Sequence, residues 1–359
     1  MAIKDVSTKM DFPELERQQI AWWDDQKIIS KYLHRNDASS SRYSFIDGPI
    51  TANNPMGVHH AWGRTYKDLF QRYHNKLGKK QRFQHGFDCQ GLWVEVEVEK
   101  ELGLKSKRDI EAFGVAEFVE MCKARVEKFA ARITSQSERL AYWMDWSDSY
   151  FTMSDENNYT IWHFLKTCWE KGWIYKGHDV MPWCPRCGTG ISEHEIVTEG
   201  YQDRTHLSVY VQFPVLDEDG AALLAWTTTP WTLAANIAAA VHPELVYVKV
   251  RQGDKTFFVA KEAAKTAIRG EHEVTGEVTG AELVGRPYAG PFEELPAAAG
   301  VQHRVIAWED VDAAEGTGIV HIAPGCGMED FALSKPLDLT VIAPINEFGV
   351  YVDGFDFLS

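Results

Sequence analysis

Residues 48–60 read Gly-Pro-Ile-Thr-Ala-Asn-Asn-Pro-Met-Gly-Val-His-His, a loop of small and polar residues that ends in two adjacent histidines. The alternating run from Tyr43 to Ile46 precedes this loop and is typical of a β-strand that enters a turn. Apolar residues at helical spacing follow the loop, up to Gly78: Trp62, Tyr66, Leu69, Phe70, Tyr73 and Leu77. We therefore predict a strand, a loop and an amphipathic helix. Unpaired N–H groups and the helix dipole attract phosphate at a helix N-terminus, so the loop is a candidate nucleotide site.

The segment from Pro49 to Asp68, with Arg64 and Lys67 inside it, resembles the ATP-binding signature of class I aminoacyl-tRNA synthetases of the isoleucine/valine/leucine group. Residues 86–92, Gly-Phe-Asp-Cys-Gln-Gly-Leu, look like the amino-acid-pocket segment of the isoleucyl members. The resemblance implies an α/β fold: the first half of a class I Rossmann-type nucleotide-binding domain, with an inserted β-barrel editing domain and a zinc knuckle. It also implies ATP with Mg²⁺ as a substrate, and isoleucine and tRNA(Ile) as partners.

The same resemblance implies roles for individual residues. The catalytic residues would be His59, His60 and Lys67. Contacts with ATP and the amino acid would come from Pro49, Thr51, Asn53, Gly57, Asp88 and Gln90. Asp88 would pair with the ammonium of the amino acid, and the backbone around Pro49 would accept hydrogen bonds from it. Read without the resemblance, His59 and His60 could be ordinary first-turn residues, and Asp88 could cap the next helix.

The histidine signature departs from the family order His-x-Gly-His. Gly57 stands at the first histidine position, His59 at the glycine position, and His60 keeps the last one. A side chain at the glycine position should obstruct adenine packing unless the loop shifts. Two imidazoles still flank the loop, and amino-acid activation depends mainly on stabilising the charge that develops on the phosphates. We therefore interpret the exchanged order as an active variant. Phe87, Gln90 and Trp93 also differ from the usual family residues, which are Trp, His and Pro.

Two segments of the carboxyl-terminal half resemble the hallmarks of an editing domain. They are residues 226–232, Trp-Thr-Thr-Thr-Pro-Trp-Thr, with Asn236 following, and residues 316–330, which contain His321 and Asp330. One methylene separates isoleucine from valine and gives weak discrimination, so a second, hydrolytic site is needed. By resemblance, Asp330 would hold the α-ammonium and His321 would shape the side-chain pocket. Thr228 and Thr229, beside Thr227, would position the tRNA terminus and the attacking water. Alternatively, the three threonines form the face of a β-strand.

Cys184 and Cys187 form a C-x-x-C-G motif, which is the knuckle of a tetrahedral zinc site. His178, His194 and His206 are candidates to complete it, although each is more often structural. In the related synthetases the second pair of cysteines comes from beyond the β insertion. We therefore expect Cys184 and Cys187 to be zinc ligands in the complete protein and only a weak site in the present chain. A redox C-x-x-C is the alternative, disfavoured because no thioredoxin-like βαβ pattern precedes it.

Composition indicates a globular protein that can bury more than one core, with 359 residues of which 45% are hydrophobic. No apolar run reaches the roughly eighteen residues of a membrane-spanning helix. The acidic N-terminus, with Asp5, Asp11, Glu14 and Glu16, argues against a targeting peptide. We expect a cytoplasmic, monomeric protein without membrane contact. The net charge of −15 predicts that the main tRNA-binding surface lies elsewhere.

We predict four parts: an N-terminal helical segment at 1–42, the first half of the catalytic domain at 43–180, a zinc knuckle at 181–200 and the editing domain at 201–359. Helices are expected at Asp11–Leu33, Ile110–Trp146 and around Ile161–Trp169. The editing domain is expected to be all-β, with strands at Ser208–Phe213, Val246–Val250, Thr256–Ala260, Gly318–Ile322 and Leu339–Ala343.

The resemblance implies ATP-dependent attachment of isoleucine to tRNA(Ile), with hydrolytic editing of valyl-tRNA(Ile). The second half of the nucleotide-binding sheet and a Lys-Met-Ser-Lys-Ser-type loop do not occur in these 359 residues, so we expect an N-terminal portion of a longer enzyme. The alternatives are valyl or leucyl specificity, a stand-alone editing hydrolase, and a non-catalytic synthetase paralogue.

Overall fold

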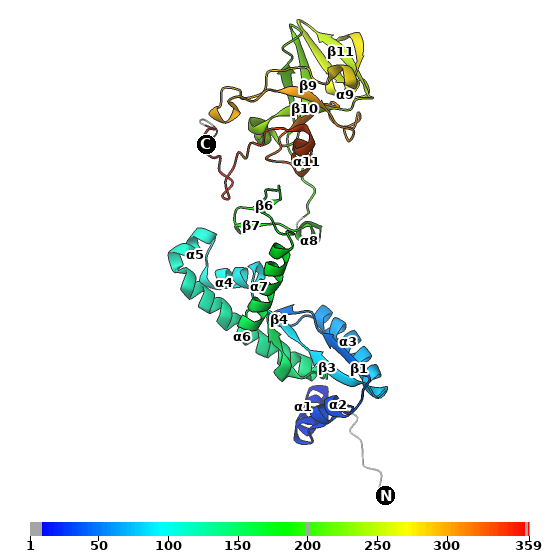
Figure 1. Ribbon diagram of the computed structural model, residues 1–359, viewed down its shortest axis with the longest axis vertical. Coiled ribbons are helices and arrows are strands. Elements are labelled where there is room, and N and C mark those ends of the chain that lie inside the picture. Colours follow the sequence, from blue (N-terminus) through cyan, green and yellow to red (C-terminus); the bar gives the residue numbers. More distant parts are fainter. Residues whose placement is uncertain (1–8, 198–200, 356–357, 359) are drawn as a thin grey trace. The chain divides into compact units, whose positions relative to one another are not determined.

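The computed structural model describes residues 9–197, 201–355 and 358, so Asp5 and the outermost residues of the expected parts lie outside it. The chain divides into two compact units, Met1–Lys176 and Gly177–Ser359 (Figure 1). Among the described residues, none of the helices combines the length and apolar character that a membrane crossing requires.

The first unit contains short parallel strands linked by helices. Strand β1 (Arg42–Ile46) pairs with β3 (Lys80–Gln84), β2 (Ile50–Thr51) pairs with β4 (Gly86–Asp88), and β4 pairs with β5 (Tyr150–Phe151), all in parallel. Helix α3 (Val58–Lys76) connects β2 to β3, as the sequence predicts. Parallel strands present their carboxyl ends at one edge, where open α/β sheets bind ligands. The loop after β2 and the end of β4 both lie at that edge.

The other helices of this unit are α1 (Phe12–Asp25), α2 (Ile28–His34), α4 (Leu92–Leu102), α5 (Lys107–Phe113), α6 (Val115–Arg139) and α7 (Asp155–Glu170), with a 3₁₀ turn, η1, at Trp146–Asp148. The single helix expected at Asp11–Leu33 is wrong, because Lys27 adopts a left-handed conformation with φ 52° between α1 and α2. The helix expected at Ile110–Trp146 is divided at Gly114, whose φ is 120°, and ends at Arg139.

Helix α3 reverses the usual arrangement of an amphipathic helix. An apolar stripe ordinarily faces the core, but the six apolar side chains of the predicted stripe are all more than half exposed. The buried face is polar and consists of Arg64, Gln71 and Asn75. Asn75 Nδ2 donates to the Tyr32 carbonyl at 3.1 Å, and Gln71 Nε2 donates to the Trp143 carbonyl. Hydrogen bonds therefore hold the inner face of α3 in place.

The described part of the second unit contains two larger sheets and one two-stranded sheet (Figure 1). A five-stranded sheet has the order β13-β11-β12-β9-β8, and a three-stranded sheet has the order β14-β10-β15. Their strands are β8 (Val209–Pro214), β9 (Ala221–Thr227), β10 (Ala238–Val241), β11 (Val246–Gln252), β12 (Lys255–Ala260), β13 (Glu273–Thr279), β14 (Arg304–Ala307) and β15 (Val320–Ile322). Strands of these sheets contribute to two hydrophobic clusters, one that includes Phe258 and one that includes Ile322.

The expectation of an all-β unit is wrong. Helical segments occur at η3 (Pro230–Ala235), α9 (Ala264–Ala267), α10 (Gly280–Leu283), η4 (Pro296–Ala298) and α11 (Met328–Leu337). The strand expected at Leu339–Ala343 is also absent from the described structure. Leu339 and Ile342 are nevertheless buried in the second cluster, so the alternating pattern there reflects burial of a loop. The other four predicted strands are confirmed, with small shifts at their ends.

At the start of this unit, β6 (Trp183–Cys184) and β7 (Thr189–Gly190) form an antiparallel pair, followed by the short helix α8 (Glu193–Glu195).

Candidate functional site

The loop after β2 is tied to the neighbouring strand. Thr51 is the register partner of Asp88, and its Oγ1 donates to Asp88 Oδ2 at 3.1 Å. Asp88 ends β4, whereas the N-cap of α4 is Gly91. Asp88 is therefore not a helix cap, and the structure places its carboxylate beside Thr51 at the carboxyl end of the parallel strands.

The two histidines lie in the first turn of α3, as predicted. Gly57 is the N-cap residue, and its N–H donates to His60 Nδ1 at 3.1 Å. Burial lowers the pKa of His60, so its ring is neutral at neutral pH, and an accepting Nδ1 places the proton on Nε2. The ring centroids of His59 and His60 are 3.9 Å apart. The helix N-terminus thus offers an imidazole N–H donor together with its backbone amides.

Lys67 lies one helical turn beyond Arg64 and pairs with Asp47, whose side chain is fully buried. His85 Nδ1 lies 3.3 Å from Asp47 Oδ2, and the Tyr142 hydroxyl donates to the same oxygen at 3.2 Å. Burial would raise the pKa of Asp47, but the hydrogen bonds from His85 and Lys67 lower it to about 2. Asp47 and His85 were not predicted as site residues from the sequence. The only indication in the sequence was that a polar residue, Asp47, directly follows the predicted strand and precedes Gly48.

Asn53 and Gln90 are held by neighbouring elements. Asn53 Nδ2 donates to the Trp93 carbonyl at 3.1 Å, and Gln90 Nε2 donates to the Thr152 carbonyl at 3.1 Å. The Thr152 hydroxyl donates back to Gln90 Oε1 at 2.5 Å. Pro49 is exposed at the entry to the loop. These contacts fix the residues on which the amino-acid-pocket interpretation depends.

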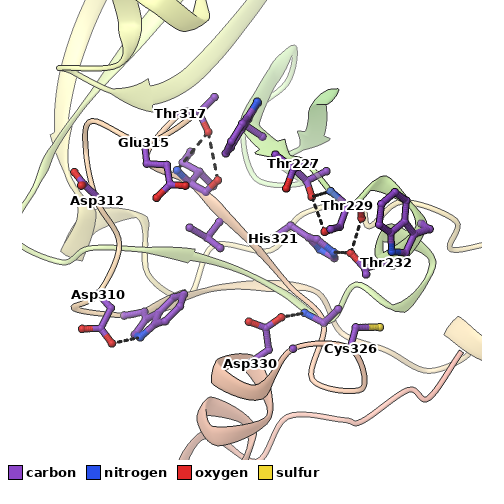
Figure 2. Close-up of a pocket in the computed structure, with 18 residues that line it drawn as sticks. Thr227, Thr229, Thr232, Asp310, Asp312, Glu315, Thr317, His321, Cys326 and Asp330 are labelled. Atoms are coloured by element: carbon purple, nitrogen blue, oxygen red, sulfur yellow. Dashed lines mark hydrogen bonds between the residues drawn. The ribbon is translucent and has the colours of Figure 1, made fainter. Parts of the chain in front are cut away.

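A pocket of about 460 Å³ in the second unit is lined by residues from both editing-like segments (Figure 2). The end of β9 and the start of η3 contribute Thr227, Thr228 and Thr229, β15 contributes His321, and α11 contributes Asp330. Residues about ninety positions apart in the sequence therefore face one cavity. Asn236 is not part of the lining but contacts the ring of His321 behind it, with Nδ2 2.8 Å from Nδ1.

The threonines form a hydrogen-bonded turn. The Thr229 N–H donates to Thr227 Oγ1 at 3.0 Å, and the Thr232 hydroxyl donates to the Thr229 carbonyl at 2.8 Å. Strand β9 ends at Thr227. The alternative of a threonine-rich strand face is therefore wrong for Thr228 and Thr229, whose backbone turns at the edge of the cavity.

Asp330 lies in the first turn of α11, and one of its carboxylate oxygens accepts the Ala323 N–H at 2.8 Å. Burial raises its pKa, and Glu329 adds to the same direction. His321 is more deeply enclosed, and burial lowers its pKa to about 4, so the ring is neutral at neutral pH.

Part of the lining was not predicted from the sequence. Trp226 and Trp231 belong to the first segment but had no role assigned, and four lining residues lie outside both segments, namely Trp308, Asp310, Asp312 and Glu315. The described lining residues include four carboxylates and neither lysine nor arginine. Such a cavity attracts a cation more than a phosphate, which is the charge preference that a site for an amino group requires.

The family model for class I tRNA synthetases of the I, L, M and V group matches residues 18–298, most of the chain. The chain belongs to this family.

Curated relatives are similar in sequence to nearly the whole chain. The isoleucine–tRNA ligase of Streptomyces coelicolor is 39% identical over 354 residues, which are 97% of the chain and 33% of the relative. Isoleucine–tRNA ligase 2 of Bacillus cereus is 39% identical over 337 residues, 94% of the chain and 32% of the relative. The isoleucine–tRNA ligase of Clostridium tetani is 38% identical over 356 residues, 98% of the chain and 34% of the relative. The chain spans about a third of the length of these relatives.

Among solved structures, the ternary complex of Agrobacterium radiobacter K84 LeuRS with tRNA and LeuAMS aligns with 96% of the chain and 45% of that protein, at 14% identity and a TM-score of 0.41. The class I synthetase fold of the chain follows from the family match over residues 18–298.

The cysteine motif of this synthetase chain forms a tight turn between β6 and β7. The Gly188 N–H donates to the Cys184 carbonyl at 2.8 Å, and Gly188 has a left-handed φ of 63°. Backbone hydrogen bonding from Cys187 lowers the pKa of Cys184, whereas burial raises the pKa of Cys187. Within the described ranges, no group of three or more His, Cys, Asp and Glu side chains is arranged to hold a metal. The described structure therefore does not bring His178, His194 or His206 together with both thiols as a ligand set.

Proposed function

We propose that this chain is part of an isoleucine–tRNA ligase that activates isoleucine with ATP and Mg²⁺, transfers it to tRNA(Ile) and hydrolyses valyl-tRNA(Ile). The support is the identity of 38–39% to proteins named isoleucine–tRNA ligase, spread over 94–98% of the chain. Valyl or leucyl specificity remains the neighbouring alternative.

In the first unit we propose that the loop after β2 binds the reactants of activation. The isoleucine carboxylate attacks the α-phosphorus of ATP, and pyrophosphate leaves. Negative charge then develops at the phosphates, near the N-terminus of α3, where the Nε2–H of His60 and the backbone amides are donors. Asp88, beside Thr51 on the adjacent strand, would pair with the isoleucine ammonium. Lys67 would act through its ion pair with Asp47, which ties α3 to the end of β1.

In the second unit we propose that the carboxylate-rich cavity is the editing site, and this cavity carries the functional assignment most directly. Asp330 would hold the α-ammonium of the misattached valine, and the threonine turn would position the terminal ribose and a water. The water oxygen attacks the ester carbonyl and the bond to the ribose oxygen breaks. The proton released by water passes to that ribose oxygen. A cavity that accepts valine and rejects one more methylene would protect isoleucyl-tRNA.

We also propose the finer architecture that the family implies: a Rossmann-type half at 43–180, a zinc knuckle at 181–200 and a closed editing barrel at 201–359, after a helical segment at 1–42. Cys184 and Cys187 offer two soft thiolate ligands from one turn, and a structural Zn²⁺ ordinarily takes four. Bound there, zinc would supply a crosslink for the turn. We further propose a cytoplasmic monomer. All six cysteines are free thiols, which suits the reducing cytoplasm.

The substitution Asp330→Ala tests the editing site. A charge-assisted hydrogen bond contributes roughly 1.5 to 3 kcal/mol, so its loss should slow hydrolysis of pre-formed valyl-tRNA(Ile) by roughly tenfold or more. The matched control is Glu329→Ala, which removes the neighbouring, exposed carboxylate of the same helical turn. We expect the control to hydrolyse at close to the wild-type rate. Equal losses in both variants, or an unchanged rate in Asp330→Ala, would show that the carboxylate does not hold the substrate.

A further inference from the structure

Behind the editing cavity lies a buried series of hydrogen bonds that runs from Tyr288 through Asn236 and His321 to Thr232. The side chains of Tyr288, Asn236 and His321 are 1%, 3% and 8% exposed. They come from separate parts of the second unit: Tyr288 follows α10, Asn236 follows η3, and His321 lies on β15. Water therefore has little access to these groups, and each proton must be assigned to a protein donor and acceptor.

The orientation of the Asn236 amide follows from its neighbours. Its Nδ2 lies 3.0 Å from the Ala238 carbonyl oxygen and 3.5 Å from the Ile322 carbonyl oxygen. Carbonyl oxygens only accept hydrogen bonds, so the NH₂ end of the amide must face them. On the other side, the Tyr288 hydroxyl donates to Asn236 Oδ1 at 2.7 Å. The amide is thus held at both ends, and turning it over would set its oxygen against two carbonyl oxygens.

This orientation decides the tautomer of His321. Asn236 Nδ2 lies 2.8 Å from His321 Nδ1, so the ring nitrogen must accept a hydrogen bond there. The proton of a neutral ring then resides on Nε2, 3.0 Å from the Thr232 hydroxyl oxygen. The Thr232 hydroxyl in turn donates to the Thr229 carbonyl at 2.8 Å. All four donors point in one direction, from Tyr288 and Asn236 toward the threonine turn (Figure 2 shows the His321 end).

A base that removes a proton from water needs a free lone pair. His321 has one unprotonated nitrogen, and Asn236 occupies it. The other nitrogen donates to Thr232, which holds the carbonyl of Thr229 at the edge of the cavity. The ring therefore connects β15 to the threonine turn and leaves neither nitrogen for the attacking water.

We propose that Tyr288 and Asn236 are positioning residues that hold His321 as the neutral Nε2–H tautomer, so that His321 orients the threonine turn as a donor and does not act as the base of ester hydrolysis. The proposal deepens the editing function and rests on it for its catalytic consequence. The tautomer itself is a property of the folded chain and is tested independently of any activity.

The first experiment measures the ¹⁵N shifts of the ring nitrogens near neutral pH in the wild-type chain, with His321 assigned from the signal lost in His321→Gln. We expect a protonated Nε2 and an unprotonated Nδ1. A protonated Nδ1, or a ring protonated on both nitrogens, would overturn the proposal. This outcome is readable even if the chain proves unable to hydrolyse valyl-tRNA, in which case the editing function fails and the tautomer assignment stands by itself.

The second experiment changes the residues that hold the ring. Asn236→Asp replaces a donor with a carboxylate of the same shape, so the proton should move to Nδ1 and hydrolysis of valyl-tRNA(Ile) should fall by at least tenfold. Tyr288→Phe keeps the ring and removes only the hydroxyl that anchors Asn236 Oδ1. We expect it to lower kcat several-fold with little change in KM, and to add a second set of His321 ring signals.

The matched control is Tyr247→Phe. Tyr247 is equally buried, and its hydroxyl donates to the Gly318 carbonyl at 2.8 Å and accepts the His242 N–H, outside the series. We expect its hydrolysis rate to stay within about twofold and its His321 signals to be unchanged. If Asn236→Asp does not fold, Tyr288→Phe and Tyr247→Phe still decide the question. Equal losses of kcat in these two variants, with unaltered His321 signals, would contradict the positioning role.

Discussion

Gly57 and His59 stand in exchanged places relative to the family signature, and the structure shows that the two positions are in contact. A Cβ atom built on Gly57 would lie 3.1 Å from His59 Cε1 and 3.2 Å from His59 Nδ1. Gly57 has an ordinary φ of −85°, so the backbone would accept a side chain. The neighbouring imidazole would have to shift by a few tenths of an ångström, so a side chain at position 57 and the ring of His59 compete for the same space.

A double-mutant cycle tests this coupling. Gly57→His alone should crowd the His59 ring and lower the free energy of unfolding of the first unit. His59→Gly removes that ring, so the double variant should be more stable than the sum of the two single effects, by roughly 1 kcal/mol. Chemical denaturation of the four proteins measures the coupling. Strict additivity would show that the two positions do not interact.

At the scale of single residues, the sequence predicts those features that depend on residues close together in the chain. The helix N-terminus that contains Gly57 and His60 is such a case, because small residues, histidines and apolar spacing occur within a short window. The Asp47 cluster could not be predicted in the same way. Its partners Lys67, His85 and Tyr142 are 20, 38 and 95 positions away, and each is an unremarkable residue in its own segment.

Among the elements, α3 shows how a correct helix prediction can give the wrong buried face. The apolar stripe that identifies the helix is exposed, and the side that packs in this unit is held by Gln71 and Asn75. Periodicity reveals that a helix has two faces, but it cannot reveal which of them the described chain covers.

Adjacent residues of α3 provide a direct test. Gln71→Leu should lower the free energy of unfolding by roughly 1 to 3 kcal/mol, because the buried Trp143 carbonyl loses its donor. Phe70→Ser changes a side chain that is 58% exposed and should alter stability by no more than about 0.5 kcal/mol. Denaturant unfolding of both variants gives the comparison. A larger loss from Phe70→Ser would mean that the apolar stripe is packed in the folded unit.

Other elements also show that local sequence patterns predict some features, whereas features that depend on distant residues are not predicted. Four predicted strands of the second unit are confirmed because alternation and turn residues mark them. The break between α1 and α2 was missed because Lys27 adopts a left-handed conformation with neither glycine nor proline to signal it. The cavity itself could be anticipated only from the likeness of two distant segments, since no local pattern shows that Thr229 and Asp330 line the same cavity.

Across the whole molecule, each unit contains a buried group with a lowered pKa, His321 in the second unit and Asp47 in the first. The folded-state pKa of His321 is about 4 against an ordinary 6.5, so its contribution to stability is complete above pH 6.5 and is lost as the pH falls toward 4. The folded-state pKa of Asp47 is about 2 against an ordinary 3.8, so its contribution is lost only as the pH falls from about 4 toward 2.

Burial also lowers the pKa of His85 in the first unit, so acid should weaken both units as the pH falls below 6.5. Hydrogen exchange followed by mass spectrometry resolves the units, and protection of β15 should decline as the pH falls from 6.5 to 4. His321→Gln should flatten the pH dependence of the second unit in that range, and Asp47→Asn should flatten that of the first unit below about pH 4. A pH dependence that is unchanged in either variant would contradict the pKa assignment of the residue it replaces.

The central claim is that the cavity between the threonine turn and Asp330 is an editing site that separates valine from isoleucine. The most direct measurement compares the rates at which the chain hydrolyses pre-formed valyl-tRNA(Ile) and isoleucyl-tRNA(Ile) under the same conditions. One methylene in a fitted pocket changes a rate by roughly tenfold or more, so we predict faster hydrolysis of valyl-tRNA by at least that factor. Equal rates, or faster hydrolysis of isoleucyl-tRNA, would contradict the account.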